Sequence, residues 1–253
     1  MVQLIYDGSF EGLLTIICEC YAQKITPVEI SSGKSQVNLF AEKQYIHTDV
    51  AKADRVWSGM RKKLNDKSRN LPLHSFLSEL PEIEMKLYRF ACLLFSSTCR
   101  IETDYGNPLV LDLVKIVRKV NQDAMRILQF VRFQKTKDDF FYAPVEPESN
   151  VLPLTIKHFK SRFADQKWLL YDVKRDYGFF YDLRQVEEVV LVEKTFPETG
   201  LLPDNLLAED EVVYQSLWKD YYNHINIKER KNLKLQRQHM PRRYWKYLTE
   251  KKL

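Results

Sequence analysis

The sequence has few of the residues that build metal sites, flexible linkers or membrane segments. It has four cysteines, at positions 18, 20, 92 and 99. No two of them are separated by two intervening residues, the spacing that zinc ribbons and iron–sulfur sites reuse. Its seven glycines in 253 residues argue against long low-complexity stretches. No apolar run is long enough to cross a bilayer, and residues 1–7 lack the pattern of a secretion signal. We therefore expect a cytoplasmic globular protein with no metal, no cofactor and no membrane association.

Basic residues are concentrated at the end of the chain. The chain has 39 Lys and Arg residues and 34 Asp and Glu residues. Residues 228–253 contain ten of the basic residues and two of the acids, so this tail has a net charge of +8. The preceding 227 residues have a net charge of −3. Within the tail, residues 240–247 (MPRRYWKY) mix cations with aromatic rings. Cations neutralise phosphates and rings stack on bases, so the tail is a candidate nucleic-acid-binding segment. A terminal helix that is basic for solubility would have the same composition.

The pattern of apolar residues changes near residue 125. Upstream, helical spacing predominates, at residues 10–21, 49–64, 81–94 and 107–124, and short strands are predicted at residues 2–6, 37–40 and 44–47. Downstream, the pattern predicts five strands with a helix between the second and third, at residues 130–135, 140–145, 168–173, 177–182 and 186–193. This order predicts an α+β fold in which an antiparallel sheet of about five strands packs against that helix.

N-terminal and C-terminal helices are expected to surround this sheet, the latter starting near residue 210. We expect residues 1–253 to form one compact unit. Two lobes are the alternative, a mainly helical one of about residues 1–125 and one of about residues 126–253 that holds the aromatic sheet and the basic helices.

Four side chains are candidates for catalysis. Asp172 and Asp182 end two predicted strands, and with Glu146 they could form a carboxylate cluster that binds magnesium or activates water. His158, on the central helix, is a candidate general acid or base. Acids at strand ends also solvate turns, and sequence spacing does not fix their mutual distance. A hydrolase of the nuclease or glycosylase type is therefore an alternative function.

Ten side chains are candidates for binding nucleic acid: Arg132, Tyr142, Arg162, Tyr181, Lys234, Arg237, Arg242, Arg243, Tyr244 and Trp245. Arg162 shares a helix face with His158, so both could reach a phosphate. The helix can cover only one face of the sheet, and the other could be an open platform on which bases stack. We expect Tyr142 and Tyr181 to be surface rings of this platform because their hydroxyls tolerate water, and Phe179 to lie in the core.

Several separated motifs occur in a fixed order along the chain: residues 6–14 (YDGSFEGLL), 132–133 (RF), 142–147 (YAPVEP), 150–154 (NVLPL), 158–159 (HF), 162–166 (RFADQ) and 241–245 (PRRYW). In these motifs the sequence resembles a bacterial family of DNA-metabolism and DNA-repair proteins that carries the domain of unknown function 4130. The resemblance covers nearly the whole chain. Several motifs in order are far more specific than any single one.

The resemblance implies a protein of DNA repair that accompanies a radical-SAM DNA-modification or repair enzyme. The chain lacks the three-cysteine motif that holds a radical-SAM cluster, so that chemistry would belong to the partner. We therefore expect an accessory protein that binds single-stranded or damaged DNA. The alternatives are the hydrolase described above and a scaffold that contacts only other proteins.

Overall fold

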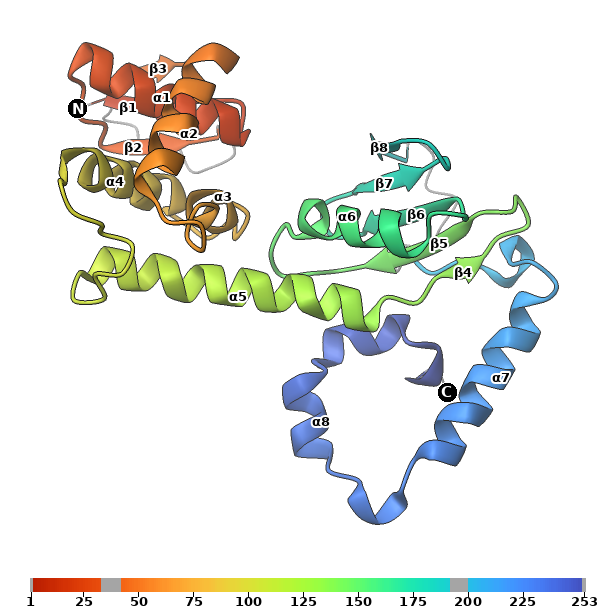
Figure 1. Cartoon of the computed structure of the whole chain (residues 1–253). Coiled ribbons are helices and arrows are strands. Elements are labelled where there is room, and N and C mark those ends of the chain that lie inside the picture. The colour runs from red at the N-terminus through yellow and green to blue at the C-terminus, as the bar shows by residue number, and fades with distance from the viewer. Residues whose placement is uncertain (1, 33–41, 192–199, 252–253) are drawn as a thin grey trace. The chain divides into compact units, whose positions relative to one another are not determined.

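The computed structural model describes residues 2–32, 42–191 and 200–251, and these fall into two compact units, Met1–Asn121 and Gln122–Leu253 (Figure 1). The predicted strand at residues 37–40 lies outside the described residues. None of the helices described is long and apolar enough to cross a membrane.

The first unit contains a parallel sheet, of which the sequence pattern predicted two members as separate strands, at residues 2–6 and 44–47, and did not predict the strand Glu29–Ser31. Its strands are β1 (Val2–Ile5), β2 (Glu29–Ser31) and β3 (Glu42–Tyr45), in the order β2-β1-β3. Helix α1 (Phe10–Gln23) connects β1 to β2 and allows them to run parallel. It begins where the Ser9 hydroxyl accepts a hydrogen bond from the Gly12 N–H.

The remaining helices described in this unit confirm the predicted helical periodicity, except for the short helix Leu71–Phe76, which was not predicted. They are α2 (Val50–Lys63), α3 (Leu71–Phe76), α4 (Ile83–Ser96) and α5 (Pro108–Phe130), the last of which continues into the second unit. Asp49 begins α2 by accepting a hydrogen bond from the Lys52 N–H. Leu13, Leu87 and Phe90 are among the side chains that form the buried core of this unit.

The second unit contains the predicted five-strand sheet, so the α+β prediction is confirmed. In the order β4-β5-β6-β7-β8, its strands are Gln134–Lys135, Phe141–Val145, Trp168–Asp172, Tyr177–Tyr181 and Val186–Val189. The sheet is mixed rather than wholly antiparallel, because β5 and β6 run parallel. Helix α6 (Leu152–Arg162) makes a crossover between these two strands, whereas short turns join the antiparallel pairs.

Both faces of this sheet are covered at its centre, which contradicts the prediction of an open platform. On one face Trp168 packs against Phe159 of α6, with ring centroids 6.1 Å apart. On the other face Tyr142 and Leu169 belong to a buried cluster that is closed by Leu202 and Leu207. The central strands β5 and β6 therefore form a core layer, whereas the edge strand β8 is partly exposed.

The predicted exposure of Tyr142 and Tyr181 is wrong, because the two rings are 0% and 4% exposed. Each hydroxyl reaches a backbone acceptor inside the protein. Tyr142 donates to the Gly200 carbonyl at 2.9 Å, and Tyr181 donates to the carbonyls of Ala164 and Leu183. A tyrosine whose hydroxyl is paired can be buried at little cost. Phe179, predicted to be core, is only partly buried.

The C-terminal part of the second unit packs back against the end of α5 and the segment that follows β5. Its elements are η1 (Asp204–Leu206), α7 (Glu211–Ile225), η2 (Lys228–Arg230), α8 (Leu233–His239), η3 (Arg242–Tyr247) and η4 (Thr249–Lys251). Tyr244, Tyr247 and Leu248 are buried, so the end of the described chain is part of the core.

Candidate nucleic-acid interface

The three candidate carboxylates do not form a cluster. Asp172 lies at the end of β6 that pairs with Tyr177, whereas Asp182 follows Tyr181 at the end that pairs with Trp168. At about 3.3 Å per residue, the two carboxylates are separated by roughly the length of the strand, about 15 Å. Among the residues that the structure describes, no three His, Cys, Asp or Glu side chains lie together as a metal ion would require. The predicted magnesium cluster is therefore wrong.

Each of these carboxylates has structural partners instead. Asp172 is fully buried, and its burial raises the pKa while the Arg175 guanidinium, at 2.8 Å, counteracts the rise. Hydrogen bonds lower the pKa of Glu146, and the bond from Lys246 contributes more than the bond from Tyr247. The backbone N–H groups of the turn after Asp182 lower the pKa of that carboxyl. Glu146 thus anchors the tail, and the other two acids stabilise turns.

Two of the candidate tail residues, Arg243 and Tyr244, are turned toward the protein. Arg243 pairs with Asp123 at 3.0 Å and also with Glu148, and the Tyr244 hydroxyl donates to Asp123 at 2.6 Å. Asp123 is 2% exposed and accepts a third hydrogen bond from the Ser149 N–H. These contacts fix the tail to the end of α5. They bury the ring of Tyr244 and neutralise the charge of Arg243, whose side chain stays partly exposed.

The neighbouring candidates remain accessible. Arg242 is exposed, with its guanidinium 6.0 Å from the ring of Trp245, and the Trp245 indole N–H donates to the Met240 carbonyl at 3.0 Å. Lys234 and Arg237 are exposed on α8, and neither has an ion-pair partner in the described ranges. The free positive charge of the tail is therefore carried by α8 and its flanking turns.

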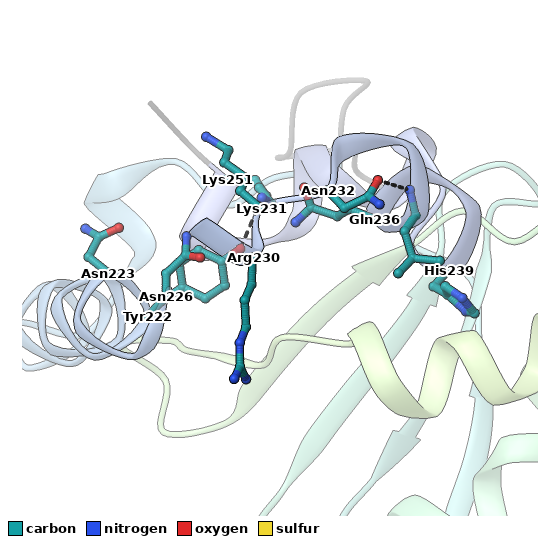
Figure 2. A pocket seen from close by; sticks show the side chains of 10 residues that line it. Tyr222, Asn223, Asn226, Arg230, Lys231, Asn232, Gln236, His239 and Lys251 are labelled. Carbon is teal, nitrogen blue, oxygen red and sulfur yellow. Dashed lines mark hydrogen bonds between the residues drawn. The ribbon is translucent and has the colours of Figure 1, made fainter. Parts of the chain in front are cut away.

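These turns border a cleft of about 540 Å³ between the end of α7, η2, α8 and η4 (Figure 2). We call it the amide-lined cleft. It is lined by Tyr222, Asn223, Asn226, Arg230, Lys231, Asn232, Leu235, Gln236, His239 and Lys251. The lining contains three cations and four carboxamides but no acid. Such a surface can bind phosphates through the cations and base edges through the amides.

Sequence reasoning found the positive charge of this region but missed the four carboxamides. The signal was the recurrence of Asn and Gln at residues 223, 226, 232 and 236, between the cations. Asn232 also begins α8 by accepting a hydrogen bond from the Leu235 N–H. The Lys251 ammonium is held at the cleft by the Tyr222 hydroxyl, at 3.2 Å.

A second pocket brings Arg132 together with His158 and Arg162, the pair that the sequence placed on one helix face. Arg132, His158 and Arg162 line a pocket of about 320 Å³ that also includes Phe133 and Phe141. We call it the histidine pocket. His158 and Arg162 lie one turn apart on α6, as predicted, and Arg132 follows the end of α5. The lining includes no acid, so this pocket also suits an anion.

A family model described as "Domain of unknown function (DUF4130)" matches residues 81–250, about two thirds of the chain. The matched range includes the five-strand sheet and both pockets apart from Lys251, whereas the strands β1 to β3 and the motif at residues 6–14 precede it. No curated protein and no solved structure matches the chain.

Proposed function

The chain belongs to the DUF4130 family, and we propose that it binds single-stranded or damaged DNA as an accessory to a radical-SAM partner enzyme. The observation that carries the proposal is the amide-lined cleft, whose lining combines Arg230, Lys231 and Lys251 with four carboxamides and contains no acid.

The charge distribution in the second unit supports a polyanionic ligand. The cations that anchor the tail, Arg243 and Lys246, are paired with acids of the body. Arg230 and Lys231, in contrast, are exposed beside the cleft, and the part of the chain described offers them no ion pair. Cations that are not neutralised internally are the ones that exchange counterions for phosphates.

The amides favour nucleic acid over a simple polyanion. Asn and Gln side chains carry both a donor and an acceptor, so they can pair with the edge of an adenine or other base. Bases in an intact duplex present these edges only in the grooves, whereas an unpaired base presents all of them. A short cleft of this size therefore suits an unpaired segment better than a duplex.

The accessory role is supported by the positions of the acids and by the family resemblance. Glu146, Asp172 and Asp182 are each engaged in structural contacts, which makes each of them less available to activate water. The radical-SAM partner rests on the resemblance of the motifs described above. We expect labelled DNA to remain intact when it is incubated with the protein and magnesium. Multiple-turnover cleavage that Asp172→Asn abolishes would favour the hydrolase instead.

The salt dependence of binding tests the cleft directly. The double variant Arg230→Ala, Lys231→Ala removes two candidate phosphate contacts. Each contact adds about 0.7 to the slope of log affinity against log salt for single strands, so the slope should fall by roughly 1.4. Fluorescence anisotropy of a labelled oligothymidylate at several salt concentrations measures it. The protein offers a matched control in Arg118→Ala, Lys119→Ala, an exposed pair on α5 in the first unit.

Equal slopes for the wild type and the cleft variant would contradict the proposal. So would an equal loss in the control variant, because that loss would show a general effect of net charge rather than a contact in the cleft. Affinity that does not change with salt in the wild-type protein would exclude phosphate binding as its basis.

A further inference from the structure

Three aromatic side chains lie along one face of α7, at the i, i+4 and i+7 positions of the helix. Tyr214, Trp218 and Tyr221 are 61%, 38% and 56% exposed, which is unusual for rings of this size. The rings of Trp218 and Tyr221 have centroids 5.7 Å apart and are tilted by 36°. Nearly all of α7 is exposed, and Glu211 is its one buried residue. The helix thus presents rings to solvent rather than to a core.

Two of these rings form a wall of a pocket of about 530 Å³ between α7 and the start of the five-strand sheet. We call it the aromatic pocket. Phe133 and Phe141 also line it, and the Arg132 guanidinium lies over the Trp218 ring, 5.3 Å from its centroid. Aromatic rings beside a guanidinium are the surroundings in which a planar base stacks.

The Trp218 ring is held in a fixed orientation. One carboxylate, Glu250, accepts hydrogen bonds from the Trp218 indole N–H at 2.9 Å and from Arg132 at 2.8 Å. Burial raises the pKa of Glu250, but the hydrogen bonds from Arg132 and Trp218 outweigh it and keep the pKa below its ordinary value. The ring and the cation are therefore already oriented before a ligand arrives, which reduces the entropy lost on binding.

The polar groups of the aromatic pocket separate the base from the phosphate. Asp210 and Glu211 line it beside Lys135, whose ammonium pairs with Asp210 at 3.5 Å and whose backbone N–H donates to Glu211 at 3.0 Å. These carboxylates offset the cations of the lining, so the pocket has no surplus of positive charge for a phosphate, and their remaining lone pairs can accept hydrogen bonds from base amino or imino groups. The histidine pocket shares Arg132, Phe133 and Phe141 with the aromatic pocket and adds His158 and Arg162 without any acid. The histidine pocket thus favours an anion, and the aromatic pocket favours a base.

We infer that the aromatic pocket binds one unpaired nucleobase, stacked on Trp218 and Tyr214, and that the adjoining histidine pocket binds a phosphate of the same strand. This inference deepens the proposed function and rests on it. The amide-lined cleft lies farther along α7. Thr249 lines the aromatic pocket and Lys251 lines the cleft, so η4 joins the two sites. From Tyr214 to Tyr222 the helix rises about 12 Å, which one strand can span.

Stacking and phosphate contacts can be measured separately in one set of titrations. We expect Tyr214→Ala and Trp218→Ala each to weaken the binding of an oligothymidylate about 5- to 150-fold at fixed salt, with the salt slope unchanged. Tyr214→Phe should bind like the wild type because it keeps the ring. The control is Tyr105→Ala, which removes a similarly exposed tyrosine, 56% accessible, from the first unit. Trp218→Ala also removes the bond to Glu250, so its melting temperature is measured in parallel, whereas the Tyr214 ring has no hydrogen bond within the described residues.

An abasic oligonucleotide with the same number of phosphates provides the decisive comparison. The wild type and Tyr214→Ala should bind it equally, because neither can stack on a missing base. Wild-type binding of the abasic strand as tight as that of the oligothymidylate would overturn the inference. Salt-dependent binding of oligothymidylate that is unchanged in both Tyr214→Ala and Trp218→Ala would also overturn it, while the proposed function would stand and the pocket would be left to a peptide ligand. If the wild type shows no salt-dependent binding, both the inference and the proposed function are contradicted.

Discussion

Two neighbouring arginines of the tail are expected to respond in opposite ways to replacement by alanine. Arg242 is exposed and lies near the Trp245 ring, whereas Arg243 pairs with Asp123 and Glu148. We expect Arg243→Ala to lower the free energy of unfolding and leave the salt slope of DNA binding unchanged. We expect Arg242→Ala to leave the free energy of unfolding nearly unchanged and to lower the salt slope. The two substitutions remove the same charge, so net charge cannot explain a difference between them.

The magnitude for Arg243→Ala follows from the surroundings of Asp123. Removing one partner of a buried ion pair generally costs about 3 to 5 kcal/mol. Here Asp123 keeps the hydrogen bonds from Tyr244 and Ser149, and the Arg243 side chain is 26% exposed, so the cost should be smaller, about 2 to 3 kcal/mol. Arg242→Ala should change stability by about 0.5 kcal/mol or less, as is usual for an exposed side chain. Its salt slope for single strands should fall by about 0.7, the contribution of one phosphate contact.

Urea unfolding followed by far-ultraviolet circular dichroism measures the stability, and anisotropy titrations measure the slope. Tyr244→Phe tests the same anchor from the other side, since it removes the second partner of Asp123 and keeps the ring. It should cost about 1.5 to 3 kcal/mol, the range for a hydrogen bond to a charged group. If Arg243→Ala unfolds at the same urea concentration as Arg242→Ala, then the pairing with Asp123 does not hold the tail in place and the reasoning fails.

Two further predictions concern groups inside the second unit. Tyr142→Phe should cost about 1 to 2 kcal/mol of stability, because it removes the buried hydrogen bond to Gly200. The same variant should keep the wild-type affinity for single-stranded DNA. Weaker binding at full stability would show instead that Tyr142 is a stacking ring. Because hydrogen bonds keep the pKa of Glu250 below 4.5, its contribution to stability should be complete above pH 4.5 and decline as the pH falls through the lower folded value. Glu250→Gln should flatten that part of a urea-unfolding profile against pH, and an unchanged profile would show that Glu250 contributes nothing.

Most of the helices and the strands of the second unit could be predicted because their signals are local. Residues 10–21 and 81–94 repeat apolar side chains at helical spacing, and residues 177–181 alternate as a strand does. The direction of β6 relative to β5 was predicted wrongly, because it depends on the whole connection through α6 rather than on either strand. The parallel sheet of the first unit was missed for the same reason, since its short strands pair across α1 and a longer connection.

The candidate site shows the same division. The basic tail, and the shared helix face of His158 and Arg162, could be predicted from composition and spacing. The accessible rings could not be, because tyrosine is as compatible with a buried, hydrogen-bonded position as with an exposed one. The structure buries Tyr142 and Tyr181 in the sheet and exposes Tyr214 and Trp218 on α7, so the stacking surface that we infer lies on a helix instead.

The sequence by itself determined the periodicity of the elements, the α+β composition and the concentration of positive charge at the end of the chain. Only the tertiary structure decided which of those charges are available. Arg243 meets Asp123 and Arg132 meets Glu250 across more than a hundred residues, so no local pattern records that these cations are paired. The physical reason is that secondary structure depends on side chains a few residues apart, whereas burial and ion pairing depend on which distant surfaces pack together. The surplus of unpaired cations around the amide-lined cleft is therefore a property of the fold.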